Sequence, residues 1–396
     1  MRTEQISSCK KYNVAFLRHG DKEIGGGFYS EFLLMKNLSK DKFNIKLLYS
    51  CDFELIELYR KEGVETIYIP LSRAITSIYK KDISYKLIDL SKYLWHMIIG
   101  IIIIKRSINE NNIDLLVLCD NLSKIIGSIA AKISGIKVIA YSRDTFVENF
   151  IGKVLRFFSL NFSDKIIAVS DETARFLKVN SKKGKVVTIH NGVEIRQFNP
   201  DRATSLRNNL KIDNHEIVIG CIAVFMEYKG HIYLLRAIKQ LQSLGVNNLT
   251  CLLIGKGDLE NQLKLFVNEE KLTDIRFLGF RRDIPDLLKT MDVLVLPSIS
   301  VEGFPRVVIE AMAMKLPVVG TTVGGVPEAV DNGKTGMLVP PQDADSLSKA
   351  IKYLIDNPEA RKKMGESGRR KVEEKFSIES IIRETEKLYL DVLQNS

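Results

Sequence analysis

The chain has 396 residues, more than one ordinary hydrophobic core accommodates, so its length predicts two domains. Hydrophobic residues make up 45% and charged residues 27% of the chain, which is typical of a globular protein and argues against disorder. The net charge of +10 favours phosphorylated substrates or an anionic membrane as partners. No zinc-finger, basic-zipper or RNA-binding signature accompanies this charge, so nucleic acid is not expected as a partner.

Short apolar runs alternate with amphipathic segments in the first half of the chain. Between the first run and a helix predicted over 30–38 lies a glycine loop, Gly25 to Gly27, where the backbone can approach a ligand closely. The alternation predicts a parallel sheet covered by helices on both faces. The predicted strands are residues 12–17, 45–49, 115–118, 137–141 and 165–169.

One apolar run, from Tyr93 to Ile104, is too short to span a bilayer, which needs about 20 residues. We predict a buried helix here, with a membrane-surface element as the alternative. Between Leu71 and Arg106, basic residues outnumber acidic ones by seven to two, and aromatic residues lie among them, as in peripheral membrane surfaces. The basic residues are Arg73, Lys80, Lys81, Lys86, Lys92, Lys105 and Arg106, and the aromatic ones are Tyr79, Tyr85, Tyr93 and Trp95.

A second series of strands follows a polar segment near 195–215, which predicts a domain boundary there. Parallel sheets bind ligands at the carboxyl ends of their strands, so a cleft between two such domains is the expected site. The tail from Ser377 to Leu393 is amphipathic and predicts a helix. The predicted strands are 217–224, 250–254, 275–277, 293–296 and 317–320.

Two glutamates, Glu302 and Glu310, are separated by seven residues after the strand at 293–296. Pro305 lies near the start of the helix that carries Glu310, where its missing N–H costs nothing. The helix N-terminus and two carboxylates suit a nucleotide-sugar. Its phosphates would bind at the helix N-terminus, and its hydroxyl groups would hydrogen-bond to the carboxylates. Carboxylates that only balance the helix dipole on a solvated face are the alternative.

Further turns follow other strands of this half, at Lys229-Gly230, Gly255-Lys256-Gly257, Gly279 and Gly324-Gly325. A lysine before a helix can pair with phosphate, although an ordinary exposed lysine explains it as well. Each turn is a weak signal alone, and their gathering around one glutamate pair favours a ligand site. The histidines and cysteines lack metal-ligand spacing, so no metal is expected.

The chain resembles the family-four glycosyltransferases, a large group of retaining enzymes with the GT-B fold. The similarity extends over nearly the whole chain, and its core is the Glu-x7-Glu motif from Glu302 to Glu310. Matching segments at 163–177, 186–198, 229–230, 255–263 and 275–298 follow in the family's order and spacing.

The resemblance implies two Rossmann-like, doubly wound parallel-sheet domains that face a central cleft. Residues 1–198 would bind the acceptor, residues 199–376 the nucleotide-sugar donor, and residues 377–396 would cross back to the first domain. The implied hexosyltransferase-like reaction transfers a sugar, with retention of anomeric configuration, to a glycan or lipid-linked acceptor. The expected setting is bacterial polysaccharide or glycolipid synthesis in the cytoplasm, at the inner membrane face, without a metal or other cofactor.

The resemblance also assigns roles to residues. Glu310 would bind the ribose hydroxyls, and Glu302 with the backbone of Gly303, Phe304 and Pro305 would contact the donor sugar. Lys229 and the helix N-terminus near Val307 would neutralise the diphosphate leaving group. The remaining donor-site residues are Gly255 and Gly279, with Gly26 and Gly27 approaching from the other domain.

Two departures from the family pattern concern positive charge. Ala223-Val224-Phe225 stands where the family usually has Gly-Arg-Leu, and Arg143 stands where it often has a histidine. We predict that Arg143 belongs to the catalytic site and contacts phosphate or acceptor, with a salt-bridged structural arginine as the alternative. The departures leave a non-catalytic sugar-nucleotide-binding homologue open as an alternative. A sugar-nucleotide epimerase is a second alternative, because it shares this architecture.

Overall fold

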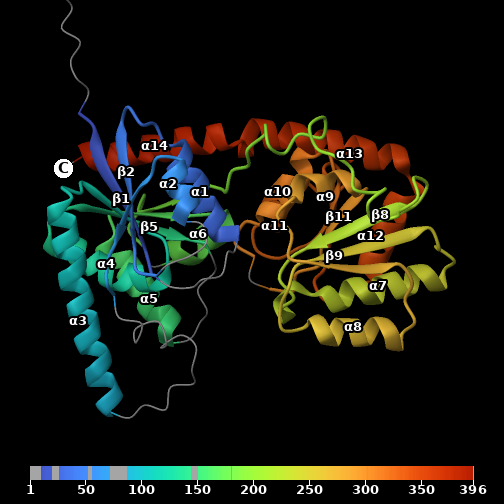
Figure 1. Ribbon diagram of the computed structural model, residues 1–396, viewed down its shortest axis with the longest axis horizontal. Coiled ribbons are helices and arrows are strands. Elements are labelled where there is room, and N and C mark those ends of the chain that lie inside the picture. The colour runs from blue at the N-terminus through green and yellow to red at the C-terminus, as the bar shows by residue number, and fades with distance from the viewer. Residues whose placement is uncertain are drawn as a thin grey trace, which may run out of the picture. The chain divides into compact units, whose positions relative to one another are not determined.

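The structure, a computed structural model, describes residues 10–19, 26–51, 56–71, 87–143, 150–179, 181–300 and 302–395 (Figure 1). The chain divides into two compact units. Unit 1 comprises Met1–Val169, Ala174–Ile189 and Ile382–Ser396, and unit 2 comprises Ser170–Thr173 and His190–Ile381. Each unit is a parallel α/β sheet, so the predicted fold class is confirmed at this level.

In the described part of unit 1, seven parallel strands lie in the order β3-β2-β1-β4-β5-β6-β7. The order reverses between β1 and β4, as in a doubly wound sheet. The strands are β1 (Tyr12–Arg18), β2 (Phe43–Tyr49), β3 (Glu65–Tyr68), β4 (Leu115–Leu118), β5 (Lys137–Ser142), β6 (Lys165–Ala168) and β7 (Val186–Thr188).

Helices cover both faces of this sheet because its central strands are apolar on both sides. Figure 1 shows α3, α4 and α5 on one side, where their apolar residues form a core with Leu116, Leu118 and Ile166. On the other side Phe32 of α1 meets Tyr59 of α2 edge to face. The helices are α1 (Gly26–Asn37), α2 (Ile56–Lys61), α3 (Leu87–Glu110), α4 (Asn121–Ile133), α5 (Phe150–Phe162) and α6 (Asp171–Lys178), which passes from unit 2 into unit 1.

Unit 2 repeats this architecture, with described parallel strands in the order β10-β9-β8-β11-β12-β13 and a reversal between β8 and β11. Helices α7, α8 and α12 pack on one face, and α9 and α10 lie on the other (Figure 1). The strands are β8 (Ile217–Ile222), β9 (Leu249–Ile254), β10 (Ile275–Gly279), β11 (Val293–Leu296), β12 (Val318–Thr321) and β13 (Gly336–Val339). The helices are η2 (Glu227–Lys229), α7 (His231–Ser243), α8 (Glu260–Glu269), α9 (Ile284–Thr290), α10 (Arg306–Ala313), α11 (Val326–Ala329), α12 (Ala344–Asp356), α13 (Pro358–Lys371) and η3 (Val372–Phe376).

The predicted strands are all present, and the edge strands β3, β7 and β13 were missed. They are only three or four residues long, and β3 and β7 are partly polar, so no long apolar run marks them. The glycine loop was also placed wrongly in part, because Gly26 and Gly27 form the first turn of α1. Gly25 lies outside the described residues.

The prediction of a buried helix for the apolar run is wrong for one face of α3. Leu94, Trp95, Ile98 and Ile102 are 51–62% exposed, whereas Ile104 and Ile108 are buried against the sheet. Of the basic and aromatic residues predicted to surround this helix, those from 72 to 86 lie outside the described residues.

The chain passes from unit 1 to unit 2 at Ile189–His190, earlier than the predicted boundary at residue 198. The segment after this point is tied to unit 2. The side chain of Asn191 donates to the carbonyl of Phe304, and Val193 pairs with Ser377.

The C-terminal helix, α14 (Ile378–Gln394), was correctly predicted as a helix, and its residues from Ile382 onward belong to unit 1. Tyr389 is fully buried and packs edge to face on Phe43, while Glu386 accepts hydrogen bonds from Ser39 and Lys42. The amphipathic tail therefore completes the core of the N-terminal sheet.

Candidate functional site

The candidate site of unit 2 lies at the switch point of its sheet, where the carboxyl ends of β8 and β11 are adjacent. Lys229 follows β8 and Glu302 follows β11. The Lys229 Nζ donates to Glu302 Oε1 at 2.6 Å, and both side chains are largely buried. The fold thus joins two residues that the sequence could only place in separate turns.

A second donor fixes the Glu302 carboxylate. The Oγ of Ser298, a fully buried residue, donates to the same Oε1 at 2.5 Å. The Ser298 carbonyl in turn accepts from the hydroxyl of Thr321 at 2.6 Å, at the end of β12. Among the described residues, the other carboxylate oxygen of Glu302 accepts no hydrogen bond and can receive one from a ligand.

Glycines let the loops at this edge pack closely. Gly230 has φ +66°, and a Cβ there would collide with the carbonyl oxygen of Pro297. Gly324 has φ +52°, and a Cβ would collide with the carbonyl oxygen of Glu302. These two turns therefore hold the Lys229 and Glu302 loops in place, which makes the glycines part of the site's support.

Helix α10 begins beside this pair. Pro305 is its N-cap residue in extended conformation, and Val307 is the second residue of the helix. The first N–H groups of a helix have no partner within it, so this end favours an anion. The helix N-terminus predicted near Val307 is therefore present.

Glu310 lies one turn into α10 and pairs with Arg306. The Arg306 Nη2 donates to Glu310 Oε1 at 2.6 Å, and Nη1 donates to the carbonyl of Gly192 at 3.2 Å. Both side chains are at most 11% exposed. No described residue donates to Glu310 Oε2, which leaves one oxygen of this carboxylate for a ligand hydroxyl.

The other predicted donor-site residues differ in how they contribute. The ring of Phe304 is buried against His190 and Phe376, at centroid distances of 4.6 and 5.0 Å. Its side chain is therefore structural. Gly303 packs against Gly325, whose Cβ would collide with the Gly303 carbonyl oxygen. Both residues position the start of α10.

Gly255 and Gly279 lie together at the ends of β9 and β10, where the Gly255 N–H donates to the Gly279 carbonyl at 2.9 Å. They adjoin the turn after β8, because the Phe225 N–H donates to the carbonyl of Lys256 at 3.0 Å. Val224, in the place of the family's arginine, is 45% exposed. Lys256 is an exposed cation beside this position.

His231, the first residue of α7, lies directly after the Lys229 loop. Burial and the positive charge of Lys229 lower the pKa of His231 to about 4, so the ring is neutral near pH 7. It contacts Phe225 edge to face, and its ring nitrogens have no hydrogen-bond partner. The histidine therefore packs as an apolar ring beneath the loop.

Glu328 anchors the start of α6 within unit 2. Its carboxylate accepts from the N–H groups of Asp171 and Glu172 at 2.7 and 2.9 Å, and from His190 at 2.9 Å. Burial opposes ionisation, and the bonds from His190 and the two N–H groups outweigh it, so the pKa of Glu328 is lowered.

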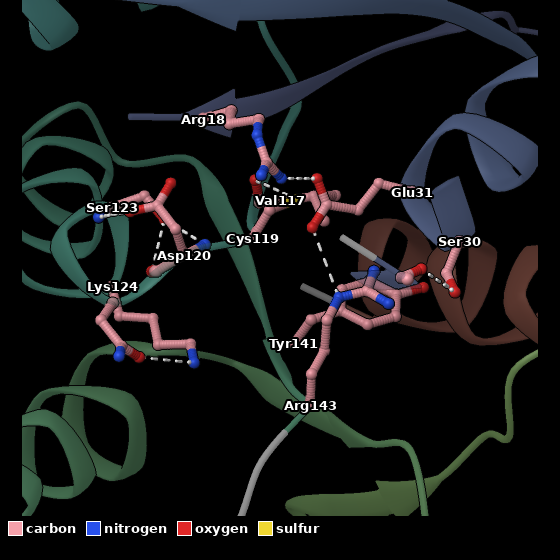
Figure 2. A network of polar contacts seen from close by, with 12 residues as sticks. Arg18, Ser30, Glu31, Val117, Cys119, Asp120, Ser123, Lys124, Tyr141 and Arg143 are labelled. Carbon is pink, nitrogen blue, oxygen red and sulfur yellow. Dashed lines mark hydrogen bonds and ion pairs between the residues drawn. The ribbon is translucent and has the colours of Figure 1, made fainter. Parts of the chain in front are cut away.

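Unit 1 has its own polar cluster at the carboxyl ends of its strands. Figure 2 shows Glu31 of α1 between Arg18, at the end of β1, and Arg143, after β5. Arg143, predicted as a catalytic-site residue, is thus ion-paired within unit 1. The backbone of Gly27 lies close to the aliphatic part of the Arg143 side chain. A Cβ built on Gly27 would lie 3.2 Å from Arg143 Cδ.

Sequence reasoning missed several partners of the predicted residues. Arg306 could have been found from its helical i, i+4 spacing to Glu310. Ser298 and Glu31 carry no local signal, because the residues they contact come from other turns of the chain. The missed residues with direct contacts to the predicted ones are Ser298, Arg306 and Glu31.

Two family models match the chain. The model described as Glycosyl transferases group 1 matches residues 203–371, and that described as Glycosyltransferase Family 4 matches residues 53–197. The capsular polysaccharide biosynthesis glycosyltransferase CapM of Staphylococcus aureus is 30% identical over 291 residues, covering 69% of this chain and 75% of that protein. A UDP-Gal:alpha-D-GlcNAc-diphosphoundecaprenol alpha-1,3-galactosyltransferase of Escherichia coli is 26% identical over 384 residues, covering 92% of each.

Solved structures share the fold. HepE of Anabaena, crystallised with UDP and glucose, has a TM-score of 0.81 at 20% identity, covering 96% of this chain and all of its own. A glycosyltransferase of Rickettsia africae has a TM-score of 0.82 at 22% identity, covering 98% of this chain and 100% of its own.

Proposed function

Because the chain belongs to the family-four glycosyltransferases, we propose that it transfers a sugar from a nucleotide-sugar to a glycan or lipid-linked acceptor with retention of anomeric configuration. The observation that carries this proposal is the buried Lys229–Glu302 pair at the switch point, beside the Arg306–Glu310 pair on α10. The relatives named for capsule synthesis and for a diphosphoundecaprenol acceptor support a role in bacterial cell-surface polysaccharide or glycolipid synthesis.

The diphosphate of the donor would bind between Lys229 and the N-terminus of α10. An ammonium group has three N–H donors, and Lys229 gives one of them to Glu302. The others are available to the phosphate oxygens, where negative charge grows as the leaving group departs. The exposed Lys256 adds a second cation near Val224, in the place of the family's arginine.

The two carboxylates would hold hydroxyl groups at either end of the donor. Glu310 keeps one oxygen on Arg306 and would accept from the ribose hydroxyls with the other. Glu302 keeps one oxygen on Lys229 and Ser298 and would accept from a hydroxyl of the transferred sugar. Each carboxylate is fixed in orientation before the ligand arrives, which reduces the entropy cost of binding.

We propose that no metal ion takes part, since Lys229, Lys256 and the α10 N-terminus would supply the positive charge. Turnover is then expected to be the same with and without EDTA. Loss of turnover with EDTA and its return with Mg²⁺ would contradict this part of the proposal.

The test of the donor site is Glu310→Gln, measured against a panel of nucleotide-sugars by binding and by release of nucleoside diphosphate. Glutamine keeps the volume and avoids the void that alanine would leave beside the buried Arg306. We expect at least a hundredfold loss in kcat/KM with Glu310→Gln and none with Glu269→Ala, an exposed control on α8. Equal activity of Glu310→Gln and wild type would overturn the site assignment.

The product distinguishes the remaining functions. A retaining transferase gives a glycosylated acceptor whose anomeric proton coupling matches that of the donor, together with free nucleoside diphosphate. An epimerase gives a new nucleotide-sugar without a glycosylated acceptor, and a non-catalytic homologue gives neither product. Nuclear magnetic resonance spectra of the reaction mixture separate the three.

We also propose that the chain works at the inner face of the cytoplasmic membrane through α3. The exposed Trp95, Ile98 and Ile102 follow one another at helical spacing, so they share a face of the helix. The exposed Lys105 and Arg106 follow them, and this pairing of apolar and basic groups fits an anionic lipid surface. Within the described residues, no helix is long and apolar enough to cross a membrane.

A further inference from the structure

Two arginines in unit 1 share one buried carboxylate. The Nη1 of Arg18 donates to Glu31 Oε2 at 2.5 Å, and the Nε of Arg143 lies 3.3 Å from Glu31 Oε1. Glu31 is 2% exposed, so solvent does little to screen either guanidinium. Glu31 thus contacts both guanidinium groups at the carboxyl ends of β1 and β5, and a second buried acid, Asp120, lies near Arg18 (Figure 2).

Several N–H donors of these guanidinium groups have no acceptor among the described residues. A guanidinium has five N–H donors, and Glu31 offers only two oxygens to both groups. The buried Nε of Arg18 and the buried Nε and Nη2 of Arg143 make no hydrogen bond. Each guanidinium group also lies over an aromatic ring. The Arg18 guanidinium is 3.7 Å from the centroid of the Phe28 ring, and the Arg143 guanidinium is 5.2 Å from the centroid of the Tyr141 ring.

The other buried acid of this cluster, Asp120, does not satisfy these donors. Its Oδ2 accepts from the backbone N–H of His19 at 2.7 Å, and its Oδ1 accepts from the N–H of Ser123 at 2.8 Å. Both oxygens thus accept from backbone N–H groups, and the second contact caps α4, while the charge of Asp120 acts on Arg18 without a hydrogen bond between them. No hydrogen bond or ion pair joins Asp120 to Arg143.

Both arginine side chains are partly exposed. Their side chains keep 15% and 13% of their surface exposed, for Arg18 and Arg143 respectively. The first turn of α1 packs on the Arg143 stem through Gly27 and has no acidic residue. The positive N-terminal end of the α1 dipole therefore adds to the positive electrostatic potential of Arg18 and Arg143.

We propose that Arg18 and Arg143 form an anion-binding site of unit 1 that recognises a phosphate or carboxylate group of the acceptor. This inference rests on the proposed function, because it names the class of acceptor that the transferase uses. A guanidinium fork binds two oxygens of such a group at once, which a histidine in place of Arg143 cannot do. Arg143 is then a residue that determines acceptor specificity, and it does not contact the donor diphosphate.

The site itself is tested by titrating inorganic phosphate into the full-length protein with calorimetric detection. We expect Arg143→Gln to weaken phosphate binding about ten- to hundredfold, and Arg143→Lys, which keeps the charge without the fork, to weaken it less. The control Arg60→Gln, an exposed arginine of α2, is expected to bind as wild type does. Weakening by Lys229→Met with no effect of Arg143→Gln places the phosphate in unit 2 and overturns the proposal.

The acceptor class is tested by transfer to three probes, farnesyl-diphosphate-linked N-acetylglucosamine, N-acetylglucosamine phosphate and the neutral octyl N-acetylglucosaminide. We expect Arg143→Gln to raise KM about ten- to hundredfold for the anionic probes only. Use of the first probe alone identifies a lipid headgroup, and use of the second identifies a soluble phosphate. The inference is overturned if Arg143→Gln raises the KM for the neutral probe equally, or if this variant binds the nucleotide-sugar more weakly than wild type does. If no probe and no donor is turned over, the proposed function fails, and the phosphate titration still decides the site.

Discussion

At the scale of single residues, the side chains of the candidate donor site are held by charge pairs. Lys229 and Glu302 neutralise one another in the absence of a ligand, and Arg306 and Glu310 do the same one helical turn away. This arrangement avoids leaving any of the four groups buried and uncompensated, which costs several kcal/mol.

Lys229→Met removes the cation that would face the leaving group. We expect kcat/KM to fall about a hundred- to a thousandfold, as for loss of a single oxyanion donor. Steady-state kinetics with the donor found by the panel would measure this. Lys239→Met, on the exposed side of α7, is the matched control. A loss that Lys239→Met reproduces would show that the effect is not specific to the site.

His231 predicts a pH dependence of stability. The folded pKa of about 4 lies below the ordinary value of 6.5, so the unfolded chain binds the proton more tightly. The stabilisation is complete above pH 6.5 and is lost as the pH falls towards 4. Relative to His231→Phe, wild type is expected to lose on the order of 1 kcal/mol of unfolding free energy between pH 7.5 and 5.5, measured by urea unfolding. Parallel pH profiles of the two proteins would contradict the prediction.

At the scale of secondary-structure elements, α3 has two different faces. Ile104 and Ile108 belong to the core of unit 1, whereas Trp95 and Ile102 are exposed. The apolar residues on the exposed face leave more than half of their side-chain surface in contact with water. A membrane surface would bury them at roughly 25 cal/mol for each Å² of apolar area, which is the physical basis of the proposed attachment.

The combined variant Trp95→Glu, Ile98→Glu and Ile102→Glu tests this face. We expect at least a tenfold loss of binding to vesicles of phosphatidylglycerol and phosphatidylethanolamine, measured by co-sedimentation. Leu265→Glu, an equally exposed apolar residue of α8, is expected to leave binding unchanged. Circular dichroism checks that the variant is folded. Binding by the triple variant equal to that of wild type would rule out α3 as the attachment site.

At the scale of the whole molecule, each unit depends on a segment distant in the chain. Unit 1 includes Ile382–Ser396, and unit 2 includes Ser170–Thr173. Tyr389 fills the space beside Phe43 and Tyr141, and it is fully buried. The core of unit 1 is therefore completed only when α14 has been made.

Tyr389→Ala should destabilise unit 1 by about 3–5 kcal/mol, because it leaves a cavity the size of an aromatic ring. Hydrogen exchange would show faster exchange in β1 and β2, with unit 2 unchanged. Lys387→Ala, exposed on the same helix, serves as the control. Equal acceleration in both units would mean that this helix does not stabilise unit 1 selectively.

The sequence by itself determined the elements and their class. Apolar runs flanked by helices defined the strands, because burial of both sheet faces requires them, and the Pro305 turn defined the start of α10. Tertiary structure decided which turns meet. Lys229 and Glu302 are 73 residues apart and contact because β8 and β11 pair in the sheet. Glu31 likewise joins Arg18 to Arg143, because β1 and β5 end and α1 begins at one edge of the sheet. Strand order is a non-local property, so no window of sequence contains these contacts.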